Sequence, residues 1–235
     1  MSQLEGKVIL VTGANRGIGL AIAQALGQEG ARLVLVGRNG AAIQRAATRV
    51  KGAVLALRAD VTRPGDVRKA LGAVRTRLGR LDVLINNAGV FTYRPFARTS
   101  LGDWKKNLDA NLTSVFLMTR EALPLLRRSR GHLLNILSIA SREAFPKCSA
   151  YCASKFGALG LTRVLREEFR PLKIRVTAII PGSTNTRLKD EFDFPVRGSE
   201  LVQPEDVAAA VLASLTQPAR STVEEVLLMP SRGKL

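Results

Sequence analysis

The sequence predicts an α/β fold in which helices cover both faces of a doubly wound, mostly parallel sheet of seven strands. Short apolar stretches rich in β-branched residues alternate along the chain with longer stretches of helical period, which is the pattern of repeated βαβ units. Several apolar stretches are nearly continuous, among them 8–11, 33–36 and 83–85. Strands need that character when helices bury both sides of a sheet.

Strands and helices are expected to alternate from one end of the chain to the other. We place strands at residues 7–12, 32–37, 53–58, 81–86, 131–138, 173–179 and 224–228, with helices in the intervals. The stretch 183–203 has no clear period and contains Pro195 and Gly198 before a helix begins at Pro204. Because long loops in compact domains are often functional, we expect a short substrate lid at about 187–203. At this length, residues 1–235 are expected to form a single domain.

Charge is the most unusual feature of the composition. The chain has 36 Lys and Arg residues against 19 Asp and Glu residues, a formal net charge of +17. Such a charge attracts acidic or phosphate-rich partners, so nucleic acid has to be considered. The cations are scattered, however, and aromatic residues make up only 5% of the chain. This distribution favours a solvated, arginine-rich surface over a nucleic-acid-binding one.

The remaining composition argues against a membrane span and a metal site. Apolar runs are far shorter than the roughly 20 residues that cross a bilayer. The N-terminus lacks a signal-like apolar segment. We therefore expect a cytoplasmic protein. The two cysteines, Cys148 and Cys152, and the single histidine, His132, cannot supply a zinc site by themselves, so the cysteines are interpreted as packing residues.

A glycine-rich turn follows the first predicted strand. It reads Thr12-Gly13-Ala14-Asn15-Arg16-Gly17-Ile18-Gly19, and a helical run over 20–29 comes next. Glycines let the backbone approach phosphate oxygens, and the helix N-terminus offers free N–H groups and a positive dipole end. No Lys-Ser or Lys-Thr pair follows the glycines, which disfavours a triphosphate-binding loop. The turn predicts a dinucleotide site.

The end of the second strand bears on which dinucleotide binds. Folds that prefer NAD usually carry a carboxylate there for the ribose 2′-hydroxyl. This chain has Gly37 and Arg38 instead, and Arg16 adds a second cation in the turn. Charge-assisted hydrogen bonds to a 2′-phosphate would favour NADP(H) over NAD(H). The alternative is that both arginines are ordinary surface residues.

A tyrosine and a lysine form the candidate catalytic pair. Tyr151 and Lys155 are four residues apart in a predicted helix, so their side chains share one face. A free phenol has a pKa near ~10, and a nearby cation lowers it. We therefore expect Lys155 to lower the pKa of Tyr151. Such pairs also arise by chance, so the context matters: Ser138 ends the fifth predicted strand thirteen residues earlier, with Ser141 as a second candidate.

Together these motifs resemble the short-chain dehydrogenase/reductase family over nearly the whole chain. The resemblance rests on the glycine turn, Asp60-Val61, Asn86-Asn87-Ala88-Gly89, the Ser138 and Tyr151-x-x-x-Lys155 set, Asn111, and Pro181-Gly182 with the residues to Thr186. It implies a Rossmann-type domain. It also implies an NADPH-dependent reductase that transfers hydride to a ketone or aldehyde, with alcohol oxidation as the reverse reaction.

The resemblance further implies a role for each matching residue. Tyr151 would pass a proton to the carbonyl oxygen, Ser138 would polarise that oxygen, Lys155 would bind the nicotinamide ribose, and Asn111 would hold a helix irregularity and a proton-relaying water. The implied catalytic residues are Asn111, Ser138, Tyr151 and Lys155. The implied cofactor-binding residues are Gly13, Asn15, Arg16, Gly17, Ile18, Gly19, Arg38, Asp60, Val61, Asn87, Ala88, Gly89, Tyr151, Lys155, Pro181, Gly182, Thr184 and Thr186.

Substrate and partners are less closely defined. The family includes reductases of 3-oxoacyl groups on acyl carrier protein, so a carrier-protein or CoA thioester is one candidate substrate among small carbonyl compounds. The residues proposed to receive an acidic carrier are Arg127, Arg128, Arg130, Arg170 and Lys173. Relatives form dimers or tetramers through the helices that carry Asn111 and Tyr151, so a homo-oligomer is expected. The alternative function is a catalytically silent nucleotide-sensing or nucleic-acid-binding protein on the same fold, which the intact catalytic set disfavours.

Overall fold

The computed structural model describes residues 2–186 and 198–233. Seven strands form one sheet in the order β3-β2-β1-β4-β5-β6-β7, and every pairing is parallel. Each strand begins and ends within two residues of its predicted position. The strands are β1 (Val8–Thr12), β2 (Arg32–Gly37), β3 (Ala53–Arg58), β4 (Val83–Asn86), β5 (His132–Ile136), β6 (Arg175–Pro181) and β7 (Glu225–Leu228). The predicted α/β fold class is confirmed.

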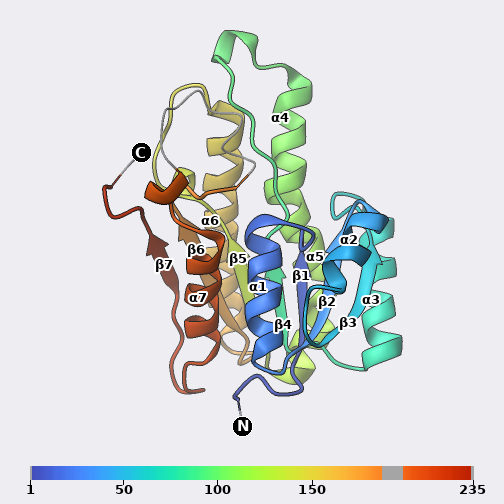
Figure 1. Cartoon of the computed structure of the whole chain (residues 1–235). Helices are drawn as coiled ribbons and strands as arrows, with labels where there is room; N and C mark the ends of the chain where they lie inside the picture. Colours follow the sequence, from blue (N-terminus) through green and yellow to red (C-terminus); the bar gives the residue numbers. More distant parts are fainter. Residues whose placement is uncertain (1, 187–197, 234–235) are drawn as a thin grey trace.

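Helices pack on both faces of this sheet (Figure 1). The α-helices are α1 (Gly17–Gln28), α2 (Gly40–Ala47), α3 (Pro64–Leu78), α4 (Leu101–Leu108), α5 (Ser114–Ser129), α6 (Ser149–Phe169) and α7 (Pro204–Leu215). Short 3₁₀ segments lie at η1 (Phe96–Arg98), η3 (Ile139–Ser141) and η5 (Gly198–Glu200), and η2 (Asp109–Thr113) is a π-helical turn. No helix in the described ranges is long and apolar enough to span a membrane.

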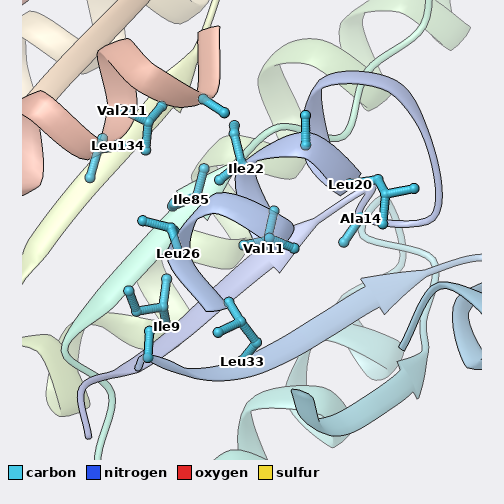
Figure 2. Close-up of a cluster of buried hydrophobic side chains, with 14 of the residues drawn as sticks. Ile9, Val11, Ala14, Leu20, Ile22, Leu26, Leu33, Ile85, Leu134 and Val211 are labelled. Atoms are coloured by element: carbon cyan, nitrogen blue, oxygen red, sulfur yellow. The ribbon is translucent and has the colours of Figure 1, made fainter. Parts of the chain in front are cut away.

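The core has two layers because successive strand residues point to opposite faces. In β1, Ile9 and Val11 pack with α1, α2 and α7, whereas Val8 and Leu10 pack with α3 and α5. Figure 2 shows part of the first layer, in which Leu26 of α1 and other side chains of this helix lie over β1. Burial of each such aliphatic side chain contributes roughly 1.5–3 kcal/mol. The two layers hold the sheet between its helices.

Because every strand is parallel to its neighbours, the carboxyl ends of all the strands lie at one edge of the sheet. The carboxyl ends of β1, β2, β3, β4, β5 and β6 therefore meet, and each is followed by a loop or turn that carries predicted site residues. The strand order reverses between β1 and β4. In open α/β sheets, ligands bind in the crevice outside the carboxyl ends at such a switch point.

Candidate active site

Tyr151 and Lys155 lie one turn apart near the start of α6. The Lys155 ammonium lies over the phenol ring, with Nζ 5.8 Å from the ring centroid. The same Nζ donates a hydrogen bond to the carbonyl oxygen of Ile136, the last residue of β5, at 3.2 Å. This bond holds the buried lysine at the carboxyl edge of the sheet.

Burial controls the protonation of both side chains. It raises the pKa of Tyr151 to about 12, and a hydrogen bond with Ser138 opposes the rise only in part. Burial also lowers the pKa of Lys155 to about 8. The expected lowering of the Tyr151 pKa by Lys155 is not found, because burial is the largest influence and raises that pKa, and Lys155 is not among the groups that shift it. The phenol is therefore held in its protonated, proton-donating form.

Two serines after β5 take different positions. The hydroxyl of Ser141 is buried and donates to the carbonyl oxygen of Ser138 at 2.6 Å. The hydroxyl of Ser138 accepts a hydrogen bond from the Ala140 amide at 3.2 Å and also bonds with Tyr151. Of the two candidates, Ser138 is the one that lies against the tyrosine. Ser141 stabilises the turn that presents it.

Asn111 lies in the π-helical turn η2 between α4 and α5. Its Nδ2 donates to the carbonyl oxygen of Val90 and to the hydroxyl of Ser154, both at 2.9 Å. Its Oδ1 accepts from the Val90 amide, also at 2.9 Å. The expected helix irregularity at Asn111 is present. This one amide connects the helix to the loop after β4 and to α6, one residue before Lys155.

Three residues near this cluster were not identified from the sequence. The ring of Phe91 meets the ring of Tyr151 edge to face, with centroids 4.8 Å apart. Next to Phe91, the buried hydroxyl of Thr92 accepts from the Asn107 amide at 2.7 Å. These contacts fix the segment after β4 that packs against the ring of Tyr151. An aromatic residue two positions after the Asn-Asn-Ala-Gly motif was the available signal.

The glycine turn after β1 has the geometry of an anion cradle. Gly13 and Gly17 have positive φ angles of 65° and 52°, which side chains adopt only with strain. A Cβ at Gly19 would lie 2.4 Å from Nδ2 of Asn87 and 2.5 Å from the carbonyl oxygen of Gly13. Arg16 occupies the N-cap position of α1, but its side chain forms no capping hydrogen bond with the helix. The first-turn amides of α1 are thus left available to an anion.

Asn87 and Thr12 fasten this turn to the end of β4. Nδ2 of Asn87 donates to the carbonyl oxygens of Thr12, at 2.9 Å, and Gly13, at 3.3 Å. The buried Thr12 hydroxyl accepts from the amides of Asn87 and Ala88. Asn87 was predicted to bind cofactor, and in this structure its side-chain amide also holds the turn. Thr12 was overlooked, although a polar residue ending an apolar strand could have indicated it.

The expected adenine end lies beyond β2 and β3. Arg38 is exposed just after β2, and Asp60 is partly buried two residues after β3. Burial raises the pKa of Asp60, but hydrogen bonds from Thr62 and the charges of Arg38 and Arg63 bring it below its ordinary value. Asp60 is therefore a carboxylate near Arg38. Among the neighbouring predicted residues, Val61 is a core residue, and Ile18 and Ala88 are partly buried against the two core layers.

The segment after β6 returns to the glycine turn. Pro181 ends β6, and the Gly182 amide donates to the carbonyl oxygen of Leu228 at 2.7 Å. The Thr184 hydroxyl donates to the carbonyl oxygen of Gly182 at 2.9 Å. The methyl group of Thr186 lies 3.4 Å from the Cβ position that Gly17 leaves empty. Predicted cofactor residues from β1 and β6 are therefore close together. Gly89 adjoins the predicted catalytic residues, because its Cβ position is 2.8 Å from Oδ1 of Asn111.

Most of the predicted lid, 187–197, lies outside the described residues. Its last part is described: Leu201 and Val202 are buried, and Asn185 donates to the side chain of Gln203 at 3.0 Å. Within the described ranges, no group of His, Cys, Asp and Glu could hold a metal ion. Both cysteines are free and buried, as expected for packing residues.

The proposed carrier-binding cations lie at the wrong end of the molecule. Arg127, Arg128 and Arg130 precede β5, and Arg170 and Lys173 precede β6. They are thus near the amino ends of these strands, whereas Tyr151 and Ser138 are at the carboxyl ends. A carrier protein bound to these cations would sit on the far side of the sheet. That part of the carrier-docking hypothesis is wrong.

Known proteins share the fold of this chain and between 27% and 33% of its sequence. The model of the family described as short chain dehydrogenase matches residues 7–194. Sepiapterin reductase of Chlorobaculum tepidum is 33% identical over 97% of this chain and 98% of its own. An alcohol dehydrogenase of Thermococcus sibiricus, solved with 5-hydroxy-NADP, superposes with a TM-score of 0.90 at 27% identity, covering 98% of this chain and 99% of its own. A 3-ketoacyl-(acyl-carrier-protein) reductase of Brucella melitensis, solved with NADH, also gives 0.90, at 30% identity and 97% of each chain.

Proposed function

We propose that this chain, which belongs to the short-chain dehydrogenase/reductase family, is an NADPH-dependent reductase of ketones or aldehydes. As a member of that family it is an oxidoreductase that acts on CH–OH and C=O groups with a nicotinamide cofactor. The direction of reaction, the phosphorylated cofactor and the substrate class are the proposal. One observation carries it: Ser138 bonds with Tyr151, Lys155 lies over the ring of Tyr151, and both Lys155 and Asn111 lie next to Gly89.

The residues present fit a dinucleotide. The glycines of the turn leave a cradle that a Cβ would fill or distort, and the first turn of α1 has unengaged amides for a pyrophosphate. Gly13, Asn15, Gly17, Gly19 and Thr186 would hold the phosphates. When bound, a reduced nicotinamide would supply the hydride for the carbonyl carbon. The remaining chemistry belongs to the side chains of the chain.

Tyr151 is the proposed acid. With its pKa raised to about 12, its phenol keeps a proton at neutral pH and can transfer it to a carbonyl oxygen that becomes an alkoxide. The Ser138 hydroxyl would donate a hydrogen bond to the same oxygen. Lys155, whose pKa burial lowers to about 8, remains largely charged at neutral pH and would stabilise the phenolate that forms. Asn111 holds the turn that supports this arrangement.

The preference for NADP(H) rests on charge. Arg16 and Arg38 are exposed near the turn and after β2, and the strand ends in Gly37 instead of an acid. A 2′-phosphate would therefore meet cations and no repelling carboxylate at that position. This preference remains a proposal.

The substrate is proposed to be a small carbonyl compound, with 3-oxoacyl thioesters as one class to test. The chain is also proposed to form a dimer or tetramer through α5 and α6. Phe116 of α5 and Phe156 of α6 are each 45% exposed, and Val164 of α6 is 54% exposed. Gly160, on the same helix face as the last two, leaves open space in which a second helix could approach.

Substitution of Tyr151 tests the reaction. We expect Tyr151→Phe to abolish turnover of a panel of ketones, pterin carbonyls and a 3-oxoacyl thioester, while NADPH binding measured by fluorescence titration is unchanged. Tyr93→Phe is the matched control, because Tyr93 is the only other tyrosine. Retained turnover in the Tyr151 variant would refute the mechanism. Failure of the wild-type protein to bind either NADPH or NADH would refute the proposed function as a whole.

A further inference from the structure

A second arginine faces Arg38 at the carboxyl ends of β2 and β3. A surface pocket there is lined by Arg38, Asn39, Gly40 and Arg58. Arg58 is the last residue of β3, and it pairs with Gly37, the last residue of β2. The two arginines therefore leave adjacent strands at the same edge of the sheet. No motif in the sequence indicated Arg58.

Sheet register determines where the Arg58 side chain lies. The Cβ position of Gly37 points toward α2, since it is 3.3 Å from Cδ1 of Ile43. Arg58, its partner in the neighbouring strand, points to the same face. Its aliphatic stem crosses the start of α2, with Cδ 3.6 Å from the Cβ position of Gly40. The glycine leaves room for the stem, and the guanidinium is brought to the N-terminal end of α2.

The pocket offers positive charge with few competing acceptors. Neither Arg38 nor Arg58 forms an ion pair with a carboxylate in the described part of the chain. Asp60 is nearby, but its Oδ1 is already bonded by the amide and hydroxyl of Thr62, at 3.0 and 2.7 Å. The Asn39 side-chain oxygen accepts from the Ala42 amide at 2.9 Å. An anion with several oxygens would satisfy both guanidinium groups.

The pocket also adjoins the glycine turn. Oδ1 of Asn15 lies 3.6 Å from the Cβ position of Gly37, so the turn and the pocket share a boundary. A dinucleotide that lays its pyrophosphate on the turn would extend its adenosine toward the ends of β2 and β3. The phosphate that distinguishes NADP from NAD is carried on that adenosine.

We propose that Arg58 is a specificity-determining residue that binds the adenosine 2′-phosphate together with Arg38. The inference rests on the proposed use of NADP(H). Discrimination between NADP(H) and NAD(H) would then depend on two arginines, Arg38 after β2 and Arg58 at the end of β3. Loss of Arg38 alone therefore leaves part of the preference for NADPH, and the double variant loses more of it than either single variant.

Calorimetric titration with adenosine 2′,5′-bisphosphate and adenosine 5′-monophosphate tests this without any turnover. Arg58→Gln keeps most of the stem over Gly40 and removes the charge. We expect it to weaken bisphosphate binding about tenfold or more and to leave monophosphate binding unchanged. Arg45→Gln removes the same charge from an exposed site on α2 outside the pocket, and we expect almost no effect. Arg38→Gln should weaken bisphosphate binding in part, and of all these variants the double variant should discriminate least between the two ligands.

Each other result has a distinct meaning. A wild-type protein that binds both ligands equally would overturn the proposed NADP(H) preference, and with it the role of Arg58. A wild-type preference that survives unchanged in Arg58→Gln would overturn the inference alone. Equal weakening of both ligands, with the melting temperature unchanged, would place Arg58 against the adenosine and would also overturn it. Arg58→Lys keeps the charge and should retain much of the discrimination between bisphosphate and monophosphate. Complete loss of that discrimination in Arg58→Lys would overturn the argument that the phosphate is bound through the charge of this residue.

Discussion

The role proposed for Lys155 requires a charged side chain, and the structure buries that side chain. Its ammonium is almost fully enclosed and has one protein acceptor among the described residues, the carbonyl oxygen of Ile136. Burial lowers its pKa to about 8, from an ordinary value of about 10.4. The folded state therefore binds this proton less well than the unfolded chain does. Without a bound dinucleotide, the site lowers the free energy of unfolding.

The sign of this effect can be measured with Lys155→Met, which keeps the length and removes the charge. Below pH 8 both states of the wild-type lysine are protonated, so the full cost is present. As pH rises from about 8 to about 10.4, the folded lysine loses its proton first and the cost disappears. We expect the variant to be inactive and more stable at pH 7 by on the order of 1–3 kcal/mol in urea unfolding, with a smaller gain at pH 10. A destabilised variant at pH 7 would mean that the bond to Ile136 outweighs the loss of hydration.

At the scale of single residues, sequence motifs indicated the four proposed catalytic side chains but few of the residues that surround them. Tyr151 and Lys155 were identifiable from their spacing along the chain, and Ser138 and Asn111 from the family resemblance. The contacts of Thr12, Phe91 and Arg58 depend on which strands become neighbours, which is not evident in a local pattern. The protonation of Tyr151 was misjudged for a similar reason, since the burial around a hydroxyl is a property of the packed molecule.

At the scale of elements, the first turn of α1 packs closely against the glycine turn after β1, and Gly19 lies at the point of contact. A Cβ at Gly19 would lie 2.5 Å from the backbone oxygen of Gly13, so the turn itself would have to move. A Cβ at Gly72, inside α3, would meet nothing within 4 Å. The two glycines therefore have opposite roles. One is required by packing, and the other only weakens its helix.

Alanine at these two positions should therefore have opposite effects. We expect Gly19→Ala to lower the melting temperature and to weaken binding of both NADPH and NADH at least about tenfold, because displacement of the turn misplaces its amides. Gly72→Ala should raise stability by about 0.5–1 kcal/mol and leave binding unchanged. Thermal melts and cofactor titrations of the two variants, side by side, check this. Normal binding by Gly19→Ala would show that the cradle tolerates a shift.

Strands and helices were predictable because apolar periodicity is strong in this chain. Strands β1, β2, β4 and β5 are almost wholly buried by helices and are largely apolar, so their positions could be predicted. The π-turn at Asn111 is different. It has no periodic signal, because it depends on an amide that bonds to Val90 and Ser154 in other segments. Only the family resemblance indicated it.

At the scale of the whole molecule, charge and exposed apolar surface are distributed differently. The net charge of +17 is spread over the chain, and the cations predicted to bind a carrier lie near the amino ends of β5 and β6, at the opposite edge of the sheet from the site. Large apolar side chains are exposed on α5 and α6, and also at Phe96 in η1, which is 80% exposed. Exposed aromatic residues on adjoining helices are typical of interfaces between subunits.

This surface leads to a prediction about assembly. We expect the protein to elute as a dimer or tetramer in size-exclusion chromatography with light scattering, and Phe156→Glu to dissociate it, since a carboxylate buried between subunits would have no partner. Phe96→Glu is the matched control, because Phe96 is more exposed than Phe156 and lies outside α5 and α6. Its assembly should be unchanged. If Phe96→Glu dissociates the protein and Phe156→Glu does not, the interface lies at η1 and the start of α4, and the faces of α5 and α6 are free.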